Sequence, residues 1–381
     1  MRKKNKKKII HIITSLRQGG AQRILSELIA STKNNFDHKI CVLLNERNSN
    51  MTKIIKSNGV EIIYINTKNP ISIFKSLIYF NKFLTAYSPD LIQTWLYHSD
   101  LFSCLFKFKK IPIIWNIRHT NSSLKSSPIH RILTIKICSL LSYIVPKIII
   151  SCSKSGIEYH EKIGYSKKFK YIPNGNTRKL ELLNSAKKRK DNKKYIIGYF
   201  HRFNQQKDIQ TFFRACNILK NKYSRKFIIL IAGANMDKKN IDLAYMIKKY
   251  QLENEIQLYG FTNEIESYIL KSDLTVLSSK EGEGCPNIII ESMSYRVPVV
   301  STDCGDSKLI ISDSGYIVPI KKPDLLAKKI DLLLRDIDDQ KKYKNLQKLC
   351  EERWEKYYQK KDMIHKYEYF WNQYSKNLEC L

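Results

Sequence analysis

Short runs of apolar residues alternate along the chain with longer segments in which apolar residues recur at helical spacing. The short runs are rich in β-branched residues and are typical of buried strands, whereas the longer segments are typical of amphipathic helices. This alternation predicts βα units and parallel sheets. The predicted strands of the first half are Ile9–Thr14, Lys39–Leu44, Val60–Ile65, Leu91–Thr94, Ile113–Asn116 and Lys147–Ser151. Those of the second half are Tyr195–Phe200, Phe227–Ala232, Ile256–Tyr259, Leu274–Leu277, Val299–Ser301 and Tyr316–Val318.

The alternation stops between 173 and 194, where turn residues and charged residues dominate. We therefore expect an amino-terminal domain over 1–176, a linker over 177–194 and a carboxyl-terminal domain over 195–357. Residues 358–381 read as a further helix that crosses back to the first domain. The predicted fold class is α/β, with two doubly wound, Rossmann-like parallel-sheet domains that face a central cleft.

The chain has 381 residues, with 67 Lys and Arg against 35 Asp and Glu, and thus a formal net charge of +32. This surplus has three readings: a lysine-rich surface that reflects codon bias, binding of nucleic acid, or attraction to an anionic membrane. The sequence lacks aromatic RNP strands and zinc-finger spacing, so no nucleic-acid partner is expected. The nine cysteines form no C-x-x-C pair, which argues against a structural zinc and favours a reducing compartment.

Two segments bear on membrane contact. The basic start, followed by the apolar run from Ile9 to Ile13, resembles a signal peptide, but the run is short and contains His11, so a buried strand is the preferred reading. No stretch reaches the ~20 apolar residues of a spanning helix. The segment from Leu101 to Lys110 interleaves large apolar residues with cations, and either core packing or contact with a membrane surface explains it.

Glycines follow the first predicted strand. Gly19 and Gly20 open a helix and can turn backbone N–H groups toward an anion, although an ordinary tight turn explains them equally well. The full G-x-G-x-x-G spacing is absent, so a nicotinamide cofactor is disfavoured. In the second half, Arg202 and Lys207 flank another strand-to-helix turn, where they could hold a pair of phosphates or simply face solvent.

The segment from Ser278 to Ser294 contains two carboxylates, Glu283 before a predicted helix and Glu291 in its second turn. Such carboxylates can accept hydrogen bonds from sugar hydroxyls and stabilise positive charge at an anomeric carbon. Alternatively, two glutamates near a helix start only favour the helix dipole.

Together these motifs resemble the retaining glycosyltransferases of family 4, which have the two-domain GT-B fold. The matching elements keep their order and intervals over nearly the whole chain. They are Gly19-Gly20-Ala21, Ile172-Pro173-Asn174-Gly175, Arg202 with Lys207, Tyr259-Gly260-Phe261, Glu283 with Glu291, and Pro298-Val299-Val300-Ser301-Thr302-Asp303-Cys304-Gly305.

The resemblance implies residue roles. Arg202 and Lys207 would hold the donor diphosphate, Glu291 the ribose, and Glu283 the donor sugar. His119, preferred over His98, would lie near the reacting centre. Donor-binding candidates are Gly19, Gly20, Arg202, Lys207, Glu283, Asn287 and Glu291, and catalytic candidates are His119, Glu283, Arg202 and Lys207. The chain departs from the family pattern at two positions, with Gln22 in place of a Glu and Cys285 in place of an aromatic residue.

The resemblance further implies retaining, metal-independent transfer of a hexose from a nucleotide-diphosphate sugar, with UDP as the first expectation. The acceptor would be a lipid-linked or other glycan in bacterial capsule or O-antigen synthesis, and no cofactor or metal is expected. Asp336-Ile337-Asp338, the single Asp-x-Asp in the sequence, reads as solvated surface. The rival readings are a nucleotide-sugar 2-epimerase of the same fold and a non-catalytic basic binding protein.

Finally, the charge surplus predicts a cytoplasmic protein that docks peripherally on the inner face of the cell membrane through its amino-terminal domain. The alternative is a freely soluble protein. The expected contacts are Lys3, Lys4, Lys6, Lys7, Lys8, Lys107, Lys109 and Lys110, with Phe102, Phe106 and Phe108 as apolar wedges.

Overall fold

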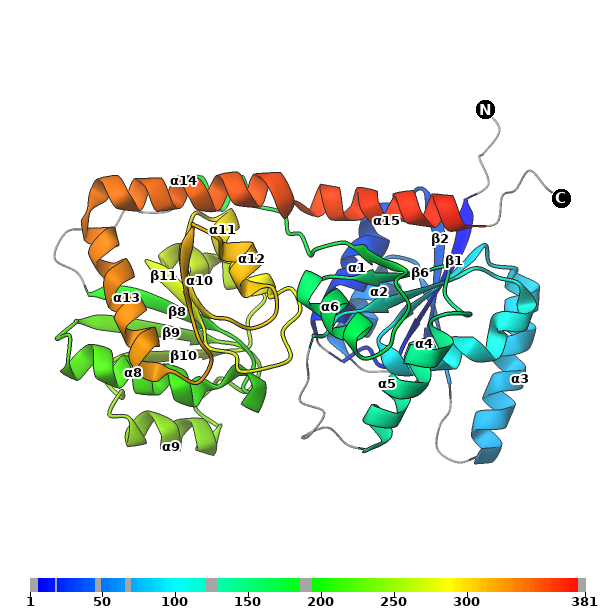
Figure 1. The fold of residues 1–381 in the computed structure, drawn as a ribbon, viewed down its shortest axis with the longest axis horizontal. Coiled ribbons are helices and arrows are strands. Elements are labelled where there is room, and N and C mark those ends of the chain that lie inside the picture. Colours follow the sequence, from blue (N-terminus) through cyan, green and yellow to red (C-terminus); the bar gives the residue numbers. More distant parts are fainter. Residues whose placement is uncertain are drawn as a thin grey trace. The chain divides into compact units, whose positions relative to one another are not determined.

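The computed structural model describes residues 6–17, 19–44, 49–65, 70–120, 129–185 and 194–375. These residues form two compact units, and each unit is built on its own parallel sheet (Figure 1). Unit 1 contains the described residues up to Thr120, those from 129 to Pro173 and those from Asp362 onward; unit 2 contains those from Asn174 to Lys361.

Unit 1 has a seven-stranded sheet in the order β3-β2-β1-β4-β5-β6-β7. Its strands are β1 (Lys7–Ile13), β2 (Phe36–Val42), β3 (Glu61–Tyr64), β4 (Leu91–Trp95), β5 (Ile113–Ile117), β6 (Ile148–Ser151) and β7 (Phe169–Tyr171). Its helices are α1 (Gly20–Thr32), α2 (Asn50–Ser57), α3 (Pro70–Tyr87), α4 (Tyr97–Ser103), η1 (Cys104–Lys109), α5 (Ile129–Leu141), α6 (Lys154–Lys162) and most of α15 (Lys360–Tyr374).

Both faces of this sheet are covered, which is why β4, β5 and β6 are buried along their whole length. On one face, α1 packs together with Tyr367 and Trp371 of α15. On the other face, Phe80 of α3, Phe106 of η1 and Ile135 of α5 share one core. Two of the three predicted membrane wedges are therefore internal: Phe106 is buried, and Phe102 packs against the same core, whereas Phe108 is exposed.

Two buried histidines explain how a polar residue is tolerated inside β1. Trp95 Nε1 donates to Nδ1 of His11 (3.3 Å), and Nε2 of His11 lies 3.1 Å from Nδ1 of His38. Nε2 of His38 lies 2.9 Å from the hydroxyl of Thr32, which donates to the carbonyl of Leu28. Neutral imidazoles satisfy every link, and burial holds the pKa of His38 at about 3. The strand reading of this segment is confirmed.

Unit 2 has a six-stranded sheet in the order β10-β9-β8-β11-β12-β13. Its strands are β8 (Tyr195–Phe200), β9 (Phe227–Ala232), β10 (Ile256–Gly260), β11 (Leu274–Leu277), β12 (Val299–Thr302) and β13 (Gly315–Val318). Its helices are α7 (Leu180–Ser185), η3 (Gln205–Lys207), α8 (Ile209–Asn221), α9 (Ile241–Lys249), α10 (Ile265–Lys271), α11 (Asn287–Ser294), α12 (Ser307–Ile311), α13 (Pro323–Asp338) and α14 (Gln340–Tyr357).

The reading of Asp336 and Asp338 as solvated surface is wrong for Asp336. The Asp336 side chain is buried on α13 and accepts a hydrogen bond of 2.5 Å from the hydroxyl of Tyr316. Asp338 accepts from the hydroxyl of Tyr195. Both carboxylates therefore tie α13 to the sheet, a role that a helical sequence pattern does not reveal.

Each predicted strand overlaps an observed one, and β7 was not predicted because it is a three-residue edge strand with a central lysine. The two Rossmann-like parallel sheets confirm the predicted fold class. Within the described part of the chain, no helix is long and apolar enough to cross a membrane. Each of the eight described cysteines is free, and Cys380 lies outside the described residues.

Candidate functional site

The candidate site lies in unit 2 at the point where the strand order reverses. β8 is the first strand of this unit, and it pairs with β9 on one side and with β11 on the other. The loops that follow β8 and β11 therefore leave the sheet in neighbouring positions at its carboxyl edge, which is where doubly wound sheets bind ligands.

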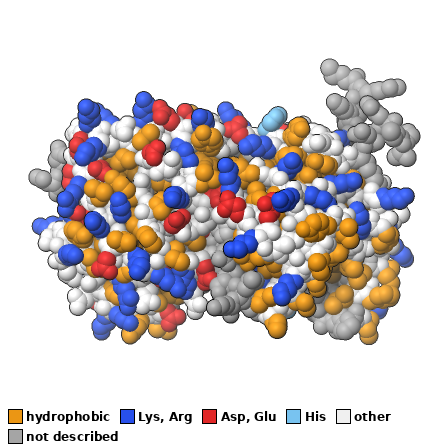
Figure 2. Space-filling view, viewed as in Figure 1, with side chains coloured by type: hydrophobic (Ala, Val, Ile, Leu, Met, Phe, Trp, Pro, Cys, Tyr) orange, Lys and Arg blue, Asp and Glu red, His pale blue; other side chains and the backbone are white. Residues whose placement is uncertain are grey.

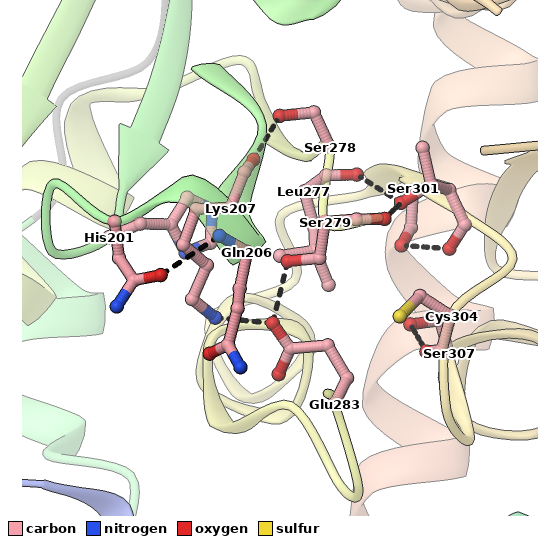
Figure 3. A network of polar contacts seen from close by, with 12 residues as sticks. His201, Gln206, Lys207, Leu277, Ser278, Ser279, Glu283, Ser301, Cys304 and Ser307 are labelled. Atoms are coloured by element: carbon pink, nitrogen blue, oxygen red, sulfur yellow. Dashed lines mark hydrogen bonds and ion pairs between the residues drawn. The ribbon is translucent and has the colours of Figure 1, made fainter. Parts of the chain in front are cut away.

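An ion pair joins these two loops. Lys207, at the end of η3, donates from Nζ to Oε1 of Glu283, which lies in the loop after β11 (Figure 3). Ser279 Oγ donates to the same oxygen at 2.6 Å. The structure thus brings together two of the predicted site residues that are 76 positions apart in sequence.

Main-chain contacts hold the lysine in place. The carbonyl of Lys207 accepts hydrogen bonds from the hydroxyls of Ser278 (2.8 Å) and Tyr199 (2.9 Å). The backbone N–H of Lys280 donates to the carbonyl of Gln206 (2.9 Å). Because both loops are pinned to each other, the ammonium group has little freedom to leave the carboxyl edge of the sheet.

The surroundings of Glu283 and His201 determine the charge state of each side chain. Burial alone would raise the pKa of Glu283, but the Lys207 ammonium and the hydrogen bond from Ser279 outweigh it and hold that pKa below its ordinary value. His201 donates from Nε2 to the carbonyl of Val276 (3.0 Å), and burial, reinforced by Lys207, lowers its pKa to about 3. The site therefore contains a carboxylate, an ammonium and a neutral imidazole.

Gly305, after β12, shapes the carboxylate loop. It has φ +61°, and an added Cβ would lie 2.5 Å from the carbonyl oxygen of Glu283 and 2.7 Å from that of Gly284. Because these atoms belong to the backbone, a side chain here would push the loop that carries Glu283. The glycine is therefore a requirement of the site.

Arg202, the other predicted phosphate ligand, lies in the same loop as Lys207. Its side chain is exposed, and within the described residues it has no hydrogen bond or ion pair. The two cations thus differ: Lys207 is held by Glu283, whereas the Arg202 guanidinium is available to an incoming anion.

The predicted helix after the carboxylate loop is observed as α11, which begins at Asn287. Glu291 is buried in its second turn. Asn174 donates from Nδ2 to Oδ1 of Asn287 (2.6 Å) and to the carbonyl of Cys285 (3.0 Å). Asn174 therefore fixes the start of the helix and the orientation of the Asn287 amide.

Unit 1 has its own reversal point between β1 and β4, and its loop is uncharged where it meets α1. Gly19 is the N-cap of α1 and provides no side-chain cap. Gln22 donates from Nε2 to the carbonyl of Ser15 (3.0 Å), and a Cβ at Gly19 would lie 2.6 Å from Gln22 Oε1. Gln22 therefore braces the loop through a neutral hydrogen bond, where the family pattern has a carboxylate.

Both candidate histidines belong to unit 1. His119 is half-buried just after β5, at the carboxyl edge of the sheet. His98 is exposed at the start of α4, with its ring centroid 6.3 Å from that of His130. The placement of His119 at a strand end agrees with the preferred choice, and its role at the reacting centre stays a prediction.

Three residues of the unit 2 site were missed: His201, Ser279 and Asn174. His201 directly follows β8, and Ser279 is the second residue after β11, so a search for polar residues within two positions of a strand end would have found both. Asn174 contacts residues more than 110 positions away, and no local sequence pattern indicates such a contact.

Chemically, the cations of this arrangement can bind an anion, and its carboxylate can stabilise positive charge on a sugar. Two cations lie in the loop at the carboxyl edge, and a carboxylate is fixed beside one of them. Within the described residues there is no group of three or more His, Cys, Asp or Glu side chains that could hold a metal ion.

Comparison with known proteins identifies the class. Residues 182–349 match the family model described as Glycosyl transferases group 1. A Campylobacter jejuni α-1,4-N-acetyl-D-galactosaminyltransferase that acts on an undecaprenol diphosphate glycan is 24% identical over 89% of this chain and 92% of its own. The Erwinia amylovora amylovoran biosynthesis glycosyltransferase AmsD is 30% identical over 38% of this chain.

The matched stretches span 39%, 64% and 50% of the lengths of the Erwinia, Methanocaldococcus and Haemophilus relatives, which is less than two thirds in each case. Among solved structures, Anabaena HepE with UDP-glucose has a TM-score of 0.78 at 15% identity, with coverage of 96% of this chain and 99% of HepE. A Rickettsia africae glycosyltransferase has a TM-score of 0.80 at 19% identity, covering 98% and 100%. Residues 182–349 thus resemble the group 1 glycosyltransferases, and the predicted family resemblance is confirmed.

Proposed function

We propose that the protein transfers a hexose, with retention at the anomeric carbon and without a metal ion, from a nucleotide-diphosphate sugar to a glycan acceptor. The observation that carries the proposal is the Lys207–Glu283 ion pair at the carboxyl edge of β8 and β11, with the Arg202 guanidinium exposed in the same loop. Two cations at this edge match the charge of a diphosphate.

In this proposal the bond between the anomeric carbon and the diphosphate oxygen breaks, and a bond to the acceptor oxygen forms on the same face of the sugar. The acceptor hydroxyl gives its proton to the departing diphosphate. Arg202 and Lys207 stabilise the negative charge that develops on the leaving group, as cations placed beside a departing diphosphate do.

Glu283 is assigned to the donor sugar. Its lowered pKa keeps it ionised at neutral pH, so it can accept hydroxyl hydrogen bonds and favour positive charge at the anomeric carbon. Glu291 is assigned to the ribose hydroxyls, with Asn287 beside it on α11.

The donor nucleotide is proposed to be UDP, because solved relatives of this fold bind UDP and UDP-glucose. The acceptor is proposed to be a lipid-linked glycan of a bacterial surface polysaccharide, since the relatives include an amylovoran enzyme and an undecaprenol diphosphate enzyme. Such an acceptor would place the protein on the inner face of the cell membrane.

A transfer assay tests the proposal. The protein is incubated with UDP-, GDP- and ADP-sugars, with and without undecaprenol diphosphate glycans, and the products are separated by mass spectrometry. The proposal expects nucleoside diphosphate and a glycosylated lipid only when the acceptor is present. Conversion of the donor sugar without acceptor would instead indicate the 2-epimerase, and salt-sensitive nucleic-acid binding without turnover would indicate a basic binding protein.

A further inference from the structure

The outer sides of two helices of unit 1 are apolar although they face solvent. On α3, Ile71, Phe74 and Ile78 are exposed at i, i+3 and i+7, and Ile71 is 70% exposed. On α5, Ile129, Leu133 and Leu140 are exposed at i, i+4 and i+11, and Ile129 is 84% exposed. Both spacings align the residues into one stripe along a helix.

These stripes are not the core-facing sides of their helices. The opposite side of α3 packs Phe80 and Leu84 into the core of unit 1, and the opposite side of α5 packs Ile135 and Cys138 into the same core. Each helix is therefore apolar on two sides, which is typical of a helix that is covered on both. Figure 2 shows hydrophobic side chains gathered where α3 forms the surface of unit 1.

The two stripes lie on helices that cover the same face of the sheet. α3, η1 and α5 all contribute to the same core, so they cover the same face of the sheet, beside the neighbouring strands β4, β5 and β6. Lys109 of η1 donates from Nζ to Oγ1 of Thr85 on the outer side of α3 (2.9 Å). Phe108 of η1, 71% exposed, adds to the same outer surface. We call the outer side of α3, η1 and α5 the apolar-cationic face.

Cations border the apolar residues of this face, and the three helices that form it contain no acidic residue. Lys75 and Lys82 are exposed on the outer side of α3, and Lys136 lies between Leu133 and Leu140 on α5. Lys107 of η1 is exposed as well, while the sequences of α3, η1 and α5 contain no Asp or Glu. By contrast, α13 of unit 2 carries Asp and Lys together.

We propose that the apolar-cationic face docks on the surface of an anionic lipid bilayer. Ile, Leu and Phe side chains can enter the boundary between headgroups and acyl chains while lysines pair with anionic headgroups. A second copy of this chain is a poorer occupant, because a symmetric contact through this face would set lysines against lysines. The proposal replaces the predicted contacts at the start of the chain: Lys6, Lys7 and Lys8 donate to main-chain carbonyls, and Lys3 and Lys4 lie outside the described residues.

Vesicle co-sedimentation tests the apolar part. The probes are phosphatidylcholine vesicles with and without 30% phosphatidylglycerol, a composition of about the charge of a bacterial leaflet. We expect wild type to prefer anionic vesicles. The triple variant Phe74→Glu, Leu133→Glu, Leu140→Glu should bind them at least ~10-fold more weakly, because it removes apolar insertion and adds repulsion.

The matched control places the same three glutamates on exposed apolar positions of unit 2, with Ile241→Glu, Tyr245→Glu and Leu325→Glu. It should bind like wild type. Equal losses in both triple variants, or no preference of wild type for anionic vesicles, would overturn the proposal. A wild-type dimer that the face variant abolishes would overturn it too, in favour of a second copy.

A charge series tests the cationic part. Lys75, Lys82, Lys107 and Lys136 are changed to Gln, and the control changes the exposed Lys238, Lys248, Lys328 and Lys344 of unit 2. The face series should lose at least ~10-fold in binding to anionic vesicles. It should also lose most of the salt dependence, and the control series should lose neither. Equal effects would contradict the proposal.

The inference uses the proposed function only for the expectation of a lipid-linked acceptor, and the two can fail separately. UDP binding measured without vesicles reports on unit 2 alone. Vesicle binding without nucleotide binding would refute the proposed function and leave the docking face standing, whereas the reverse result would refute the docking face alone.

Discussion

The two units share a strand order but differ at their reversal points. In unit 2 the loops beyond β8 and β11 hold a lysine and a glutamate in contact, with four side-chain hydroxyl and main-chain hydrogen bonds around them. In unit 1 the loop beyond β1 carries Gly19 and Gly20, and a neutral glutamine braces it. The same topology thus places an ion pair at the strand edge of unit 2. In unit 1, the loop after β1 has no charged residue at its junction with α1.

The difference indicates a division of labour. The proposed diphosphate donor would need positive charge, and unit 2 has Arg202 and Lys207 at its strand edge. Unit 1 instead presents cations on the outer side of its helices, where they border Ile, Leu and Phe. The Lys207–Glu283 ion pair lies at the strand edge of unit 2, whereas the lysines that border exposed apolar residues lie on the outer side of helices in unit 1.

The largest expected effect comes from removing the two cations at the strand edge of unit 2. Lys207→Ala and Arg202→Ala should each lower turnover on the order of 10²–10³-fold, because each removes a cation from the leaving diphosphate. Lys220→Ala and Arg214→Ala serve as controls, since both residues lie on α8 of the same unit, and Lys220 is also paired, with Glu255. Steady-state kinetics decide: near-normal turnover in both site variants would mean that the diphosphate binds elsewhere.

A second prediction separates the two carboxylates of unit 2. Glu283→Gln should lower kcat about 10²-fold at saturating donor, because the neutral amide no longer favours positive charge on the sugar. Glu291→Gln should mainly raise the KM for donor, since contacts to the ribose are present in ground and transition states alike. If both variants changed kcat and KM in the same way, the assigned division between sugar and ribose would be wrong.

A third prediction compares one glycine in each unit. Gly305→Ala introduces a Cβ against backbone atoms at a positive φ, so strain of about 1–3 kcal/mol should displace the Glu283 loop and lower both thermal stability and activity. Gly19→Ala meets only the end of the flexible Gln22 side chain and should cost activity within a few-fold. Differential scanning calorimetry and donor kinetics on both variants give the ranking, and a reversed ranking would contradict it.

The smallest effect concerns acid stability. Burial lowers the pKa of His11, of His38 to about 3 and of His160 to about 4 in unit 1, and of His201 to about 3 in unit 2. Below the ordinary pKa of 6.5 the unfolded chain binds protons that the folded chain does not. The free energy of unfolding therefore decreases as the pH is lowered. Each histidine contributes up to about 1.4 kcal/mol per pH unit.

Asp100 of unit 1, whose pKa burial raises, acts in the opposite sense and offsets part of the effect of the three histidines. Unit 1 still keeps the larger net dependence, because unit 2 has one such histidine among those named. Between pH 7.5 and pH 5, hydrogen exchange corrected for intrinsic rates should therefore show a greater loss of protection in unit 1 than in unit 2. Equal losses would mean that the buried histidines of unit 1 become protonated without unfolding it. His38→Gln should reduce the pH dependence of unit 1 and leave that of unit 2 unchanged.

Much of the fold was predictable because both sheets are buried on two faces. β6 and β9 are continuous apolar runs because neither face of their sheets is exposed to solvent. Such runs are readily identified as buried strands. β7 was not predicted because a three-residue edge strand is too short to show a hydrophobic pattern. Asp336 was misread because helical sequence alone does not show that Tyr316 of another element would bury its carboxylate.

The site was predictable in part. Arg202, Lys207 and Glu283 were predicted from their positions after strands and from the family pattern, and the structure places all three at the carboxyl edge of unit 2. The contact between Lys207 and Glu283 was not, because it depends on β8 and β11 being neighbours in the sheet. Ser279 and His201 share this property: their importance lies in what the topology brings beside them.

Binding of nucleoside diphosphates by calorimetry tests the central claim most directly. UDP, GDP and ADP are titrated into wild type, Arg202→Ala, Lys207→Ala and the Lys220→Ala control. The account predicts that at least one diphosphate binds wild type and the control equally, and that either site variant weakens it about 10-fold or more. Equal affinity in all four proteins would contradict the assignment of the diphosphate to the charged edge of unit 2.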